Sequence, residues 1–270
     1  MPTFLIAETL DDEAAAWLGE RGDVAWCRHD DDGFDAALAA ADALIVRTYT
    51  RVDGELLGKA PRLRVVGRAG VGLDNIDVEA CRSRGVEVVY TPDANTQAVV
   101  EYVLALMLDH VRPRPAMPAS VSAADFHLLR KTQVGRQLDR LNLGVLGHGR
   151  IGRRVGAVAH VLGMNVMACD LLGEPQLRKT AEYPFEYVDH DTLYRKSDVL
   201  TVHVDGRSGN RHMIGTGVLE RLQPHVLLIN AARGMLVDAN ALAAWARQCP
   251  DAFAVLDVHD PEPPTAEYAL

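Results

Sequence analysis

Short apolar runs alternate with helix-periodic stretches through the first hundred residues of the chain. Strands are predicted wherever about four mostly apolar residues follow one another, at 3–7, 24–27, 43–47, 63–66 and 86–90. Apolar positions at helical spacing predict helices between them, at 11–19, 34–41 and 77–84. Strands that alternate with helices, without hairpin signals, are typical of an α/β fold with a doubly wound parallel sheet.

The same alternation returns in the second half of the chain. Apolar runs predict strands at 143–146, 166–169, 197–204, 226–230 and 253–258. Helices are expected after the first of these strands, at 216–222, and from the cap Asp238 to about Gln248. The chain is therefore predicted to hold two doubly wound parallel-sheet domains.

A long apolar helix, 96–111, separates the two blocks, and the proline-rich stretch 112–118 ends it. This helix has the length of a connector that packs on both domains. We therefore expect a first domain at 1–95, an inter-domain helix and linker at 96–118, and a second domain at 119–270. The polar segment 120–140 is only weakly helical in its pattern.

The densest chemical signal runs from Leu143 to Asp170, where a strand, a glycine motif, a helix and a second strand follow in order. The motif is a complete G-x-G-x-x-G made by Gly147, Gly149 and Gly152. Such glycines allow a tight turn, a close approach of pyrophosphate to the backbone, and helix-on-strand packing. Three glycines alone would also fit an ordinary turn, but the complete strand–helix–strand unit favours dinucleotide binding.

Asp170 ends the second strand, at about the 20-residue distance from the glycines that is expected of the acid that binds the ribose hydroxyls. A carboxylate there favours NAD over NADP, because it would repel a 2′-phosphate. Arg150 and Ile151 open the helix, whose N-terminus offers amide groups and a positive dipole end to phosphates.

The composition and net charge limit the classes of partner that the chain is expected to bind. The 270 residues carry 28 basic and 37 acidic side chains, a net charge of −9, which argues against nucleic acid or a membrane surface as the main partner. The four cysteines are scattered and form no C-x-x-C pair, so no metal site or disulfide framework is predicted. No apolar run reaches membrane-spanning length, and we expect a cytoplasmic protein.

Three further stretches complete a family pattern: VGRAGVGLDNID at 66–77, INAARGMLVD at 229–238 and LDVHDPEP at 256–263. With GHGRIG they make the chain resemble the D-isomer-specific 2-hydroxyacid dehydrogenase family, and within it the phosphoglycerate dehydrogenase branch. The resemblance implies a flavodoxin-like substrate domain, a Rossmann NAD-binding domain and a homodimer. It also implies hydride transfer between nicotinamide and C2 of a small 2-hydroxy or 2-keto acid, with D-3-phosphoglycerate as the best guess.

The resemblance also assigns roles to single residues. Arg233 matches the arginine that binds the substrate carboxylate, and Glu262 matches the acid that tunes the catalytic histidine. On the cofactor side, the resemblance implies roles for His203, Ala231 and Asp257, with Asp257 holding the nicotinamide carboxamide.

In the first domain, the resemblance assigns substrate binding to a glycine loop and to two other positions. The loop would receive the substrate carboxylate on its backbone amides, Arg47 would contact the far end of the substrate, and Asn95 starts the helix beside the cleft. A surface arginine is an equally good interpretation of Arg47. The loop residues are Ala69, Gly70, Val71 and Gly72.

Two departures from the family pattern leave alternatives open. The family's acid–base histidine follows the glutamate in a Pro-His step, but no histidine follows Glu262 in these 270 residues. We therefore expect the chain to be a truncated and impaired form that lacks the segment returning to the first domain. A glyoxylate/hydroxypyruvate-type reductase and a non-catalytic NAD(H)-binding sensor or co-regulator are the alternatives. The second departure is at 205–207, where the family tends to carry a proline and threonines.

Overall fold

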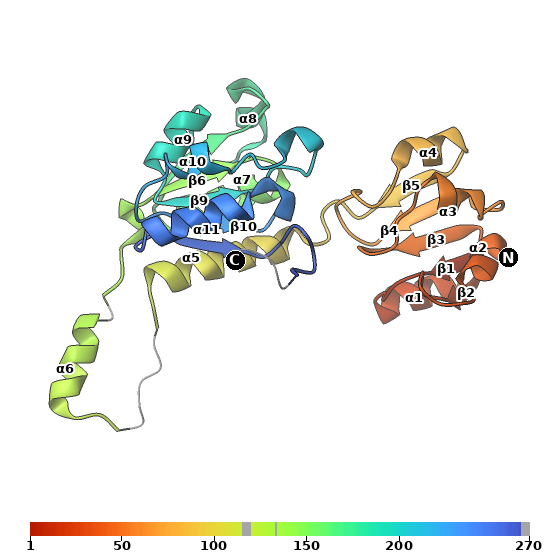
Figure 1. The fold of residues 1–270 in the computed structure, drawn as a ribbon, viewed down its shortest axis with the longest axis horizontal. Coiled ribbons are helices and arrows are strands. Elements are labelled where there is room, and N and C mark those ends of the chain that lie inside the picture. The colour runs from red at the N-terminus through yellow and green to blue at the C-terminus, as the bar shows by residue number, and fades with distance from the viewer. Residues whose placement is uncertain (115–119, 133, 266–270) are drawn as a thin grey trace. The chain divides into compact units, whose positions relative to one another are not determined.

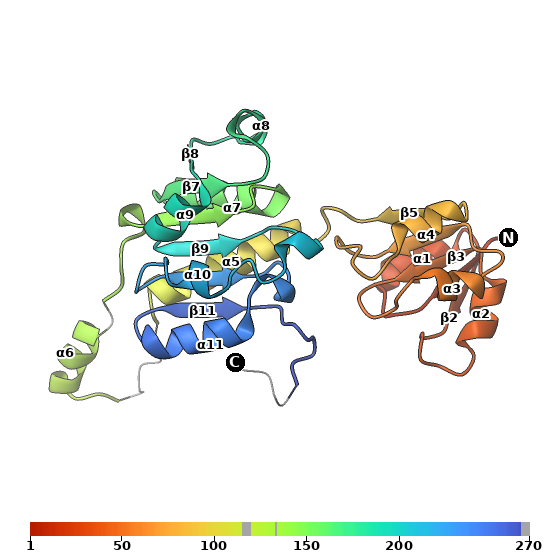
Figure 2. The same cartoon turned by 45° about the horizontal axis from the view of Figure 1, so that its top comes forward.

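The computed structural model describes residues 1–114, 120–132 and 134–265, so the end of the predicted linker, 115–118, lies outside the described residues. Contacts divide the chain into two compact units, Met1–Asn95 and Thr96–Leu270 (Figures 1 and 2). The long helix predicted as a connector begins the second unit. In the described part of the chain, no helix is long and apolar enough to cross a membrane.

The first unit is built on a five-stranded sheet in the order β2-β1-β3-β4-β5, with every pair parallel. The strands are β1 (Thr3–Ile6), β2 (Asp23–Trp26), β3 (Ala43–Val46), β4 (Val65–Arg68) and β5 (Glu87–Tyr90). This order confirms the predicted doubly wound sheet. The fourth strand begins two residues later than expected, because Leu63 is buried in the turn that precedes the ladder.

Four helices connect these strands: α1 (Asp12–Gly19), α2 (Phe34–Ala40), α3 (Gly54–Gly58) and α4 (Val78–Ser83). Asp11 caps α1 as predicted, because its carboxylate accepts the backbone N–H groups of Glu13 and Ala14. The apolar sides of the later helices meet the strands, with Leu38, Leu57 and Cys81 in the core.

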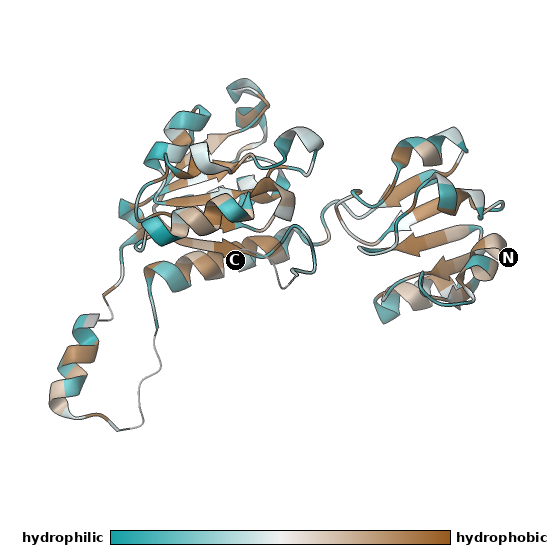
Figure 3. Ribbon diagram, viewed as in Figure 1, coloured by the Kyte–Doolittle hydropathy of each residue, from teal (hydrophilic) through white to brown (hydrophobic). Residues whose placement is uncertain are grey.

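The second unit holds a six-stranded parallel sheet in the order β11-β10-β9-β6-β7-β8. Its strands are β6 (Asn142–Leu146), β7 (Asn165–Cys169), β8 (Glu186–Tyr187), β9 (Val199–Val202), β10 (Leu227–Asn230) and β11 (Phe253–Leu256). This is the order of a Rossmann sheet, with the topological switch between β6 and β9. The central strands are brown in Figure 3, as expected for strands buried on both faces.

In the second unit, α5 (Thr96–Val111) lies against α7 (Arg150–Val161), with Val100, Val103 and Met107 in the shared core. Asp238 caps α11 as predicted. The helices are α5 (Thr96–Val111), α6 (Ala123–Thr132), α7 (Arg150–Val161), α8 (Glu174–Thr180), α9 (His190–Lys196), α10 (Thr216–Leu219) and α11 (Ala239–Gln248).

A half-buried carboxylate, that of Asp198, ties together the N-terminal ends of three strands. Asp198 accepts the backbone N–H of Asn142 at 2.9 Å, Arg136 Nη2 at 2.7 Å and His225 Nε2 at 2.9 Å. Burial by itself would raise the pKa of Asp198, but the three donors lower this pKa by more than burial raises it. The pKa of Asp198 is therefore below its ordinary value. The Asp198 cluster therefore fixes the sheet edge opposite to the glycine loop.

Candidate functional site

The glycine loop joins β6 to α7, and two of its glycines are required by sterics. Gly147 has φ +92°, and a Cβ there would lie 2.7 Å from the carbonyl carbon of His203. A Cβ on Gly152 would lie 2.1 Å from the carbonyl oxygen of Gly147. The loop can therefore keep its shape only with glycine at both positions, as the motif predicted.

Gly149 serves a different purpose, because it is the N-cap of α7 and has open space where a Cβ would stand. A glycine cap offers no side-chain oxygen to the amides of the first helical turn, so these amides are left for an anion. Arg150 and Ile151 are the first residues of that turn. The open cradle at the start of a twelve-residue helix fits the pyrophosphate of a dinucleotide.

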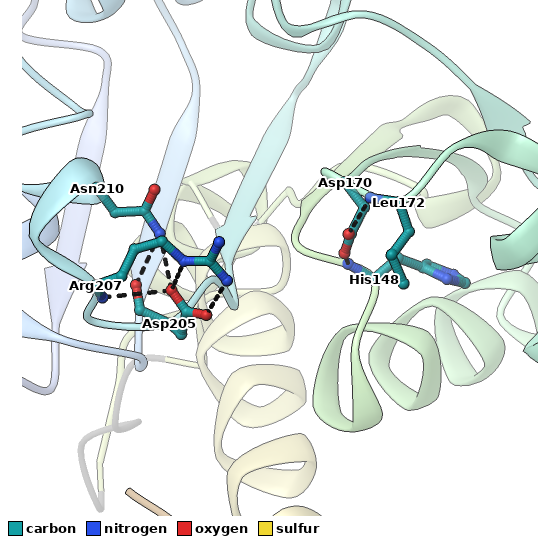
Figure 4. A network of polar contacts seen from close by, with 6 residues as sticks. All are labelled: His148, Asp170, Leu172, Asp205, Arg207 and Asn210. Carbon is teal, nitrogen blue, oxygen red and sulfur yellow. Dashed lines mark hydrogen bonds and ion pairs between the residues drawn. The ribbon is translucent and has the colours of Figure 1, made fainter. Parts of the chain in front are cut away.

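Asp170 follows β7 and its carboxylate is held beside the loop (Figure 4). Its Oδ2 accepts the backbone N–H of His148 at 2.7 Å, and its Oδ1 accepts that of Leu172 at 2.9 Å. Each carboxylate oxygen can accept a second hydrogen bond, so ribose hydroxyls fit the remaining lone pairs. The same negative charge disfavours a 2′-phosphate.

His148, the middle residue of the first G-x-G, has a role that the sequence did not reveal. Only 3% of the residue is exposed, and its Nε2 lies 2.7 Å from Tyr183 Oη. The ring stacks on Phe185 at a centroid distance of 4.7 Å. Burial lowers the pKa of His148, which is therefore neutral at pH 7. The loop is thus anchored to the segment before β8.

His203 follows β9 and lies beside the glycine loop. Its backbone N–H donates to the carbonyl of Leu146 at 2.7 Å, and its Nε2 lies 2.8 Å from Thr201 Oγ1. Burial lowers the pKa of His203 to about 4. A neutral, fixed ring suits the wall of a cofactor site, but such a low pKa makes His203 a weak proton acceptor.

The segment after His203, where the sequence departs from the family pattern, forms a turn closed by its own side chains (Figure 4). Arg207 Nε donates to Asp205 Oδ1 at 2.7 Å, and Asn210 Nδ2 donates to the Asp205 carbonyl at 3.0 Å. The pKa of Asp205 is lowered, chiefly by the Arg207 guanidinium. An ion-paired turn stands here in place of the proline and threonines.

Arg233 lies just beyond the C-terminal end of β10, and its loop is shaped by Asn230. The fully buried Asn230 donates from Nδ2 to the Arg233 carbonyl at 2.9 Å and accepts the Ala232 N–H at 3.1 Å. Ala231 lies inside this turn. Gly234 comes directly after Arg233, and a Cβ on it would lie 1.9 Å from the His259 carbonyl oxygen. The loops after β10 and β11 are therefore in direct contact.

Asp257 follows β11 and donates its backbone N–H to the Asn230 carbonyl at 3.0 Å. Its carboxylate faces Tyr102 of α5; burial, with the charge of Asp257 and a hydrogen bond to it, raises the pKa of Tyr102. Glu262 lies further along, in an exposed segment. Asp257 and Arg233 thus leave adjacent strands at the same edge.

In the first unit, the predicted substrate residues leave the ends of β3 and β4. Arg47 follows β3, and its Nη1 donates to Thr9 Oγ1 at 3.1 Å. The residues 69–72 follow β4, and Gly70 has φ +157°, which favours glycine. Arg47 also lines a cavity of about 620 Å³ at the ends of β1, β2 and β3, which the sequence did not indicate. Asn95 is exposed and ends this unit.

The strand order aligns the predicted cofactor residues of the second unit, and the predicted catalytic residue Arg233, along one edge. In the order of the sheet, Asp257 follows β11, Arg233 follows β10, His203 follows β9, the glycine loop follows β6, and Asp170 follows β7. Ligands of such sheets bind at the carboxyl ends of the strands. The adenosine end of an extended dinucleotide would lie at Asp170 and its nicotinamide end near Asp257.

Comparison with known proteins agrees with this geometry. Residues 104–270 match the model of the D-isomer specific 2-hydroxyacid dehydrogenase, NAD binding domain. The chain is 38% identical to a D-3-phosphoglycerate dehydrogenase of Mycobacterium leprae, over 98% of the chain and 50% of that protein. It is also 38% identical to a (S)-sulfolactate dehydrogenase of Chromohalobacter salexigens, over 100% of the chain and 87% of that protein.

A solved structure extends the likeness to a ligand-bound protein. The D-lactate dehydrogenase of Aquifex aeolicus, complexed with NAD and lactic acid, aligns with a TM-score of 0.78 and 26% identity. The alignment covers 98% of the chain and 82% of that structure. The chain spans about half the length of the D-3-phosphoglycerate dehydrogenases that it matches. It belongs to the D-isomer-specific 2-hydroxyacid dehydrogenase family, whose NAD-binding domain its residues 104–270 represent.

Proposed function

We propose that the chain transfers a hydride reversibly between C2 of a D-2-hydroxy acid and nicotinamide. The observation that carries this proposal is the line of residues along the edge of the second sheet. It runs from the carboxylate Asp170, through the glycine cradle, to Arg233 and Asp257 on adjacent strands. A protein that only bound a dinucleotide would have no use for a guanidinium at the nicotinamide end of this line.

In this reaction NAD, when bound, supplies the hydride acceptor. Asp170 and the α7 amides hold the cofactor, while Asp257 orients its carboxamide. Arg233 binds the substrate carboxylate bidentately and so fixes C2 for transfer, which is an effect of proximity and orientation. As the hydride leaves C2, the hydroxyl proton passes to a base, which the family resemblance gives as a histidine after Glu262 that is paired with this acid. No histidine follows Glu262 in these 270 residues, and the weakly basic His203 does not fill the role.

For the substrate we propose a 2-hydroxy acid that carries a second anionic group on C3, with D-3-phosphoglycerate as the first candidate. Arg47 would bind that distal group, and the backbone amides of Ala69, Gly70, Val71 and Gly72 would receive the carboxylate. The names of two relatives support this class, because phosphoglycerate and sulfolactate both carry a strong acid at that end. A hydroxypyruvate-type substrate would lack it.

We also propose that the chain works as a homodimer in the cytoplasm. The four cysteines are free thiols in the structure, which suits a reducing compartment. Light scattering at micromolar concentration tests the dimer, and a monomeric mass would contradict it.

The test of the function is steady-state NADH formation with D-3-phosphoglycerate, D-glycerate and D-lactate. Arg233→Ala should lower kcat/KM at least 100-fold while changing NADH affinity less than threefold, because the guanidinium acts on the substrate. Arg195→Ala, which removes an exposed guanidinium paired with Asp191, is the matched control. These 270 residues should bind NADH but oxidise the acids poorly, and a form extended after Leu270 by a segment that carries the Pro-His step should oxidise them. Tight NADH binding without oxidation of any of these acids by the extended form would contradict the proposal and support the sensor alternative.

A further inference from the structure

The loop after β3 wraps its backbone around one carboxylate. Glu8 Oε1 accepts the N–H of Arg47 and of Thr50, each at 2.9 Å, and Oε2 accepts the N–H of Thr48 at 2.9 Å. The N–H of Tyr49 lies 3.2 Å from both oxygens. Four consecutive amides of 47–50 therefore converge on Glu8, which stands at the end of the neighbouring strand β1.

The carbonyl groups of the same loop are also held. Asn75 Nδ2 donates to the carbonyl of Arg47 at 3.1 Å and to that of Thr50 at 2.7 Å. Burial raises the pKa of Glu8, but the four amides lower it more, to about 2, so the side chain is ionised at neutral pH. The loop therefore has one well-defined backbone shape, although 47–49 are exposed.

This backbone sets the direction of Arg47. The Arg47 guanidinium donates to Thr9 Oγ1, near the ends of β1 and β3. Arg47 and Thr9 both line the cavity of about 620 Å³. We propose that Glu8 is a positioning residue, which holds the loop 47–50 so that Arg47 is preset for the distal anionic group of the substrate. This inference rests on the proposed function, because it requires that Arg47 binds such a group.

The negative charge of Glu8 allows a positioning role to be distinguished from a purely electrostatic one. A carboxylate beside an anion site repels the anion, so a purely electrostatic effect of removing its charge would tighten the binding of a phosphorylated substrate. Loss of the positioned loop would instead weaken the binding of a phosphorylated substrate. In Glu8→Gln, the Nε2 donor would face amide donors such as that of Thr48, so the loop would lose its single shape.

The experiment measures the dissociation constants of D-3-phosphoglycerate and D-glycerate by titration calorimetry in the presence of NADH. We expect Glu8→Gln and Arg47→Ala each to lower the preference for the phosphorylated acid about 10-fold, and the double variant to lower it no further. Amide hydrogen exchange should show 47–50 protected in the unaltered chain and exposed in Glu8→Gln. Asp42→Asn is the control, since Asp42 accepts the Thr3 N–H at the opposite end of the same sheet.

Tighter phosphoglycerate binding by Glu8→Gln, an unchanged preference, or equal binding of the two acids by the unaltered chain would each overturn the inference. The proposed function is judged separately, by NADH formation in the same preparations. Oxidation of D-glycerate with an unchanged preference would leave the function standing and remove the role of Glu8. Preferential binding of the phosphorylated acid that depends on Glu8, without oxidation of either acid, would support the role of Glu8 and contradict the proposed function.

Discussion

The contact between His148 and Tyr183 can be tested by removing one atom. Tyr183→Phe deletes only the hydroxyl and leaves His148 Nε2, in a residue that is 3% exposed, without its partner at 2.7 Å. An unsatisfied buried ring nitrogen costs about 1–3 kcal/mol, and no methylene group is lost, so we expect destabilisation within that range. Because the hydroxyl and the ring depend on each other, His148→Phe combined with Tyr183→Phe should restore most of the loss.

The measurement needs a probe of the second unit alone. Of the three tryptophans, only Trp245 belongs to that unit, and it is 8% exposed. Urea unfolding followed by its fluorescence, in a chain carrying Trp17→Phe and Trp26→Phe, reports the free energy of unfolding there. Tyr187→Phe, in a half-buried side chain of β8 in the same unit, is the matched control.

The coupling energy between the two substitutions tests whether His148 and Tyr183 stabilise the glycine loop as a pair. We expect the double variant to be at least 1 kcal/mol more stable than the sum of the single effects requires. Strictly additive effects, or a change below about 0.3 kcal/mol in Tyr183→Phe, would refute the view that this pair anchors the glycine loop.

Three other predictions follow from the same sheet edge. Gly152→Ala should cost about 1–3 kcal/mol of unfolding free energy and at least 10-fold in NADH affinity, because its Cβ would lie 2.1 Å from the Gly147 carbonyl, whereas Gly19→Ala, in open space, should cost neither. Asp170→Asn should narrow the preference for NADH over NADPH in fluorescence titrations, and equal binding by the unaltered chain would count against Asp170 as the ribose acceptor. His203 has a folded pKa of about 4, below the ordinary 6.5, so its contribution to stability is complete above pH 6.5 and is lost as the pH falls towards 4. Between pH 6.5 and 5 this loss is at most about 2 kcal/mol, and urea unfolding of His203→Gln should lack it.

The fold was predictable from local signals where those signals were long or chemically specific. Apolar runs located most strands, and the G-x-G-x-x-G spacing located the turn into α7. The region 174–196 was missed, because β8 has two residues and α8 and α9 have seven each, too few for a clear period. β8 pairs with β7, and α9 lies against β6 and β7, which are tertiary contacts that a local pattern does not report.

The site was predictable only where a motif fixed it. The glycine loop and Asp170 are positioned by the strand–helix–strand order, so spacing was sufficient. Glu8 and the loop that it holds are about 40 residues apart, and Asn230 acts through hydrogen bonds across its own turn. An acid after a strand and an asparagine before a turn are common, so neither has a sequence signal of its role. Their roles follow from three-dimensional proximity alone.

The Asp198 cluster has a consequence for how this scaffold can change. It lies at the N-terminal edge of the sheet, where Arg136, His225 and the start of β6 meet, while the predicted cofactor residues leave the opposite edge. We therefore expect substitutions around Asp198 to change the melting temperature more than cofactor binding, and substitutions in the loops after the strands to leave the contacts of Asp198 in place. A library that varies the carboxyl-end loops but keeps Gly147, Gly152 and the His148–Tyr183 contact would therefore retain the Asp198 cluster as a stabilising contact at the other end of the sheet.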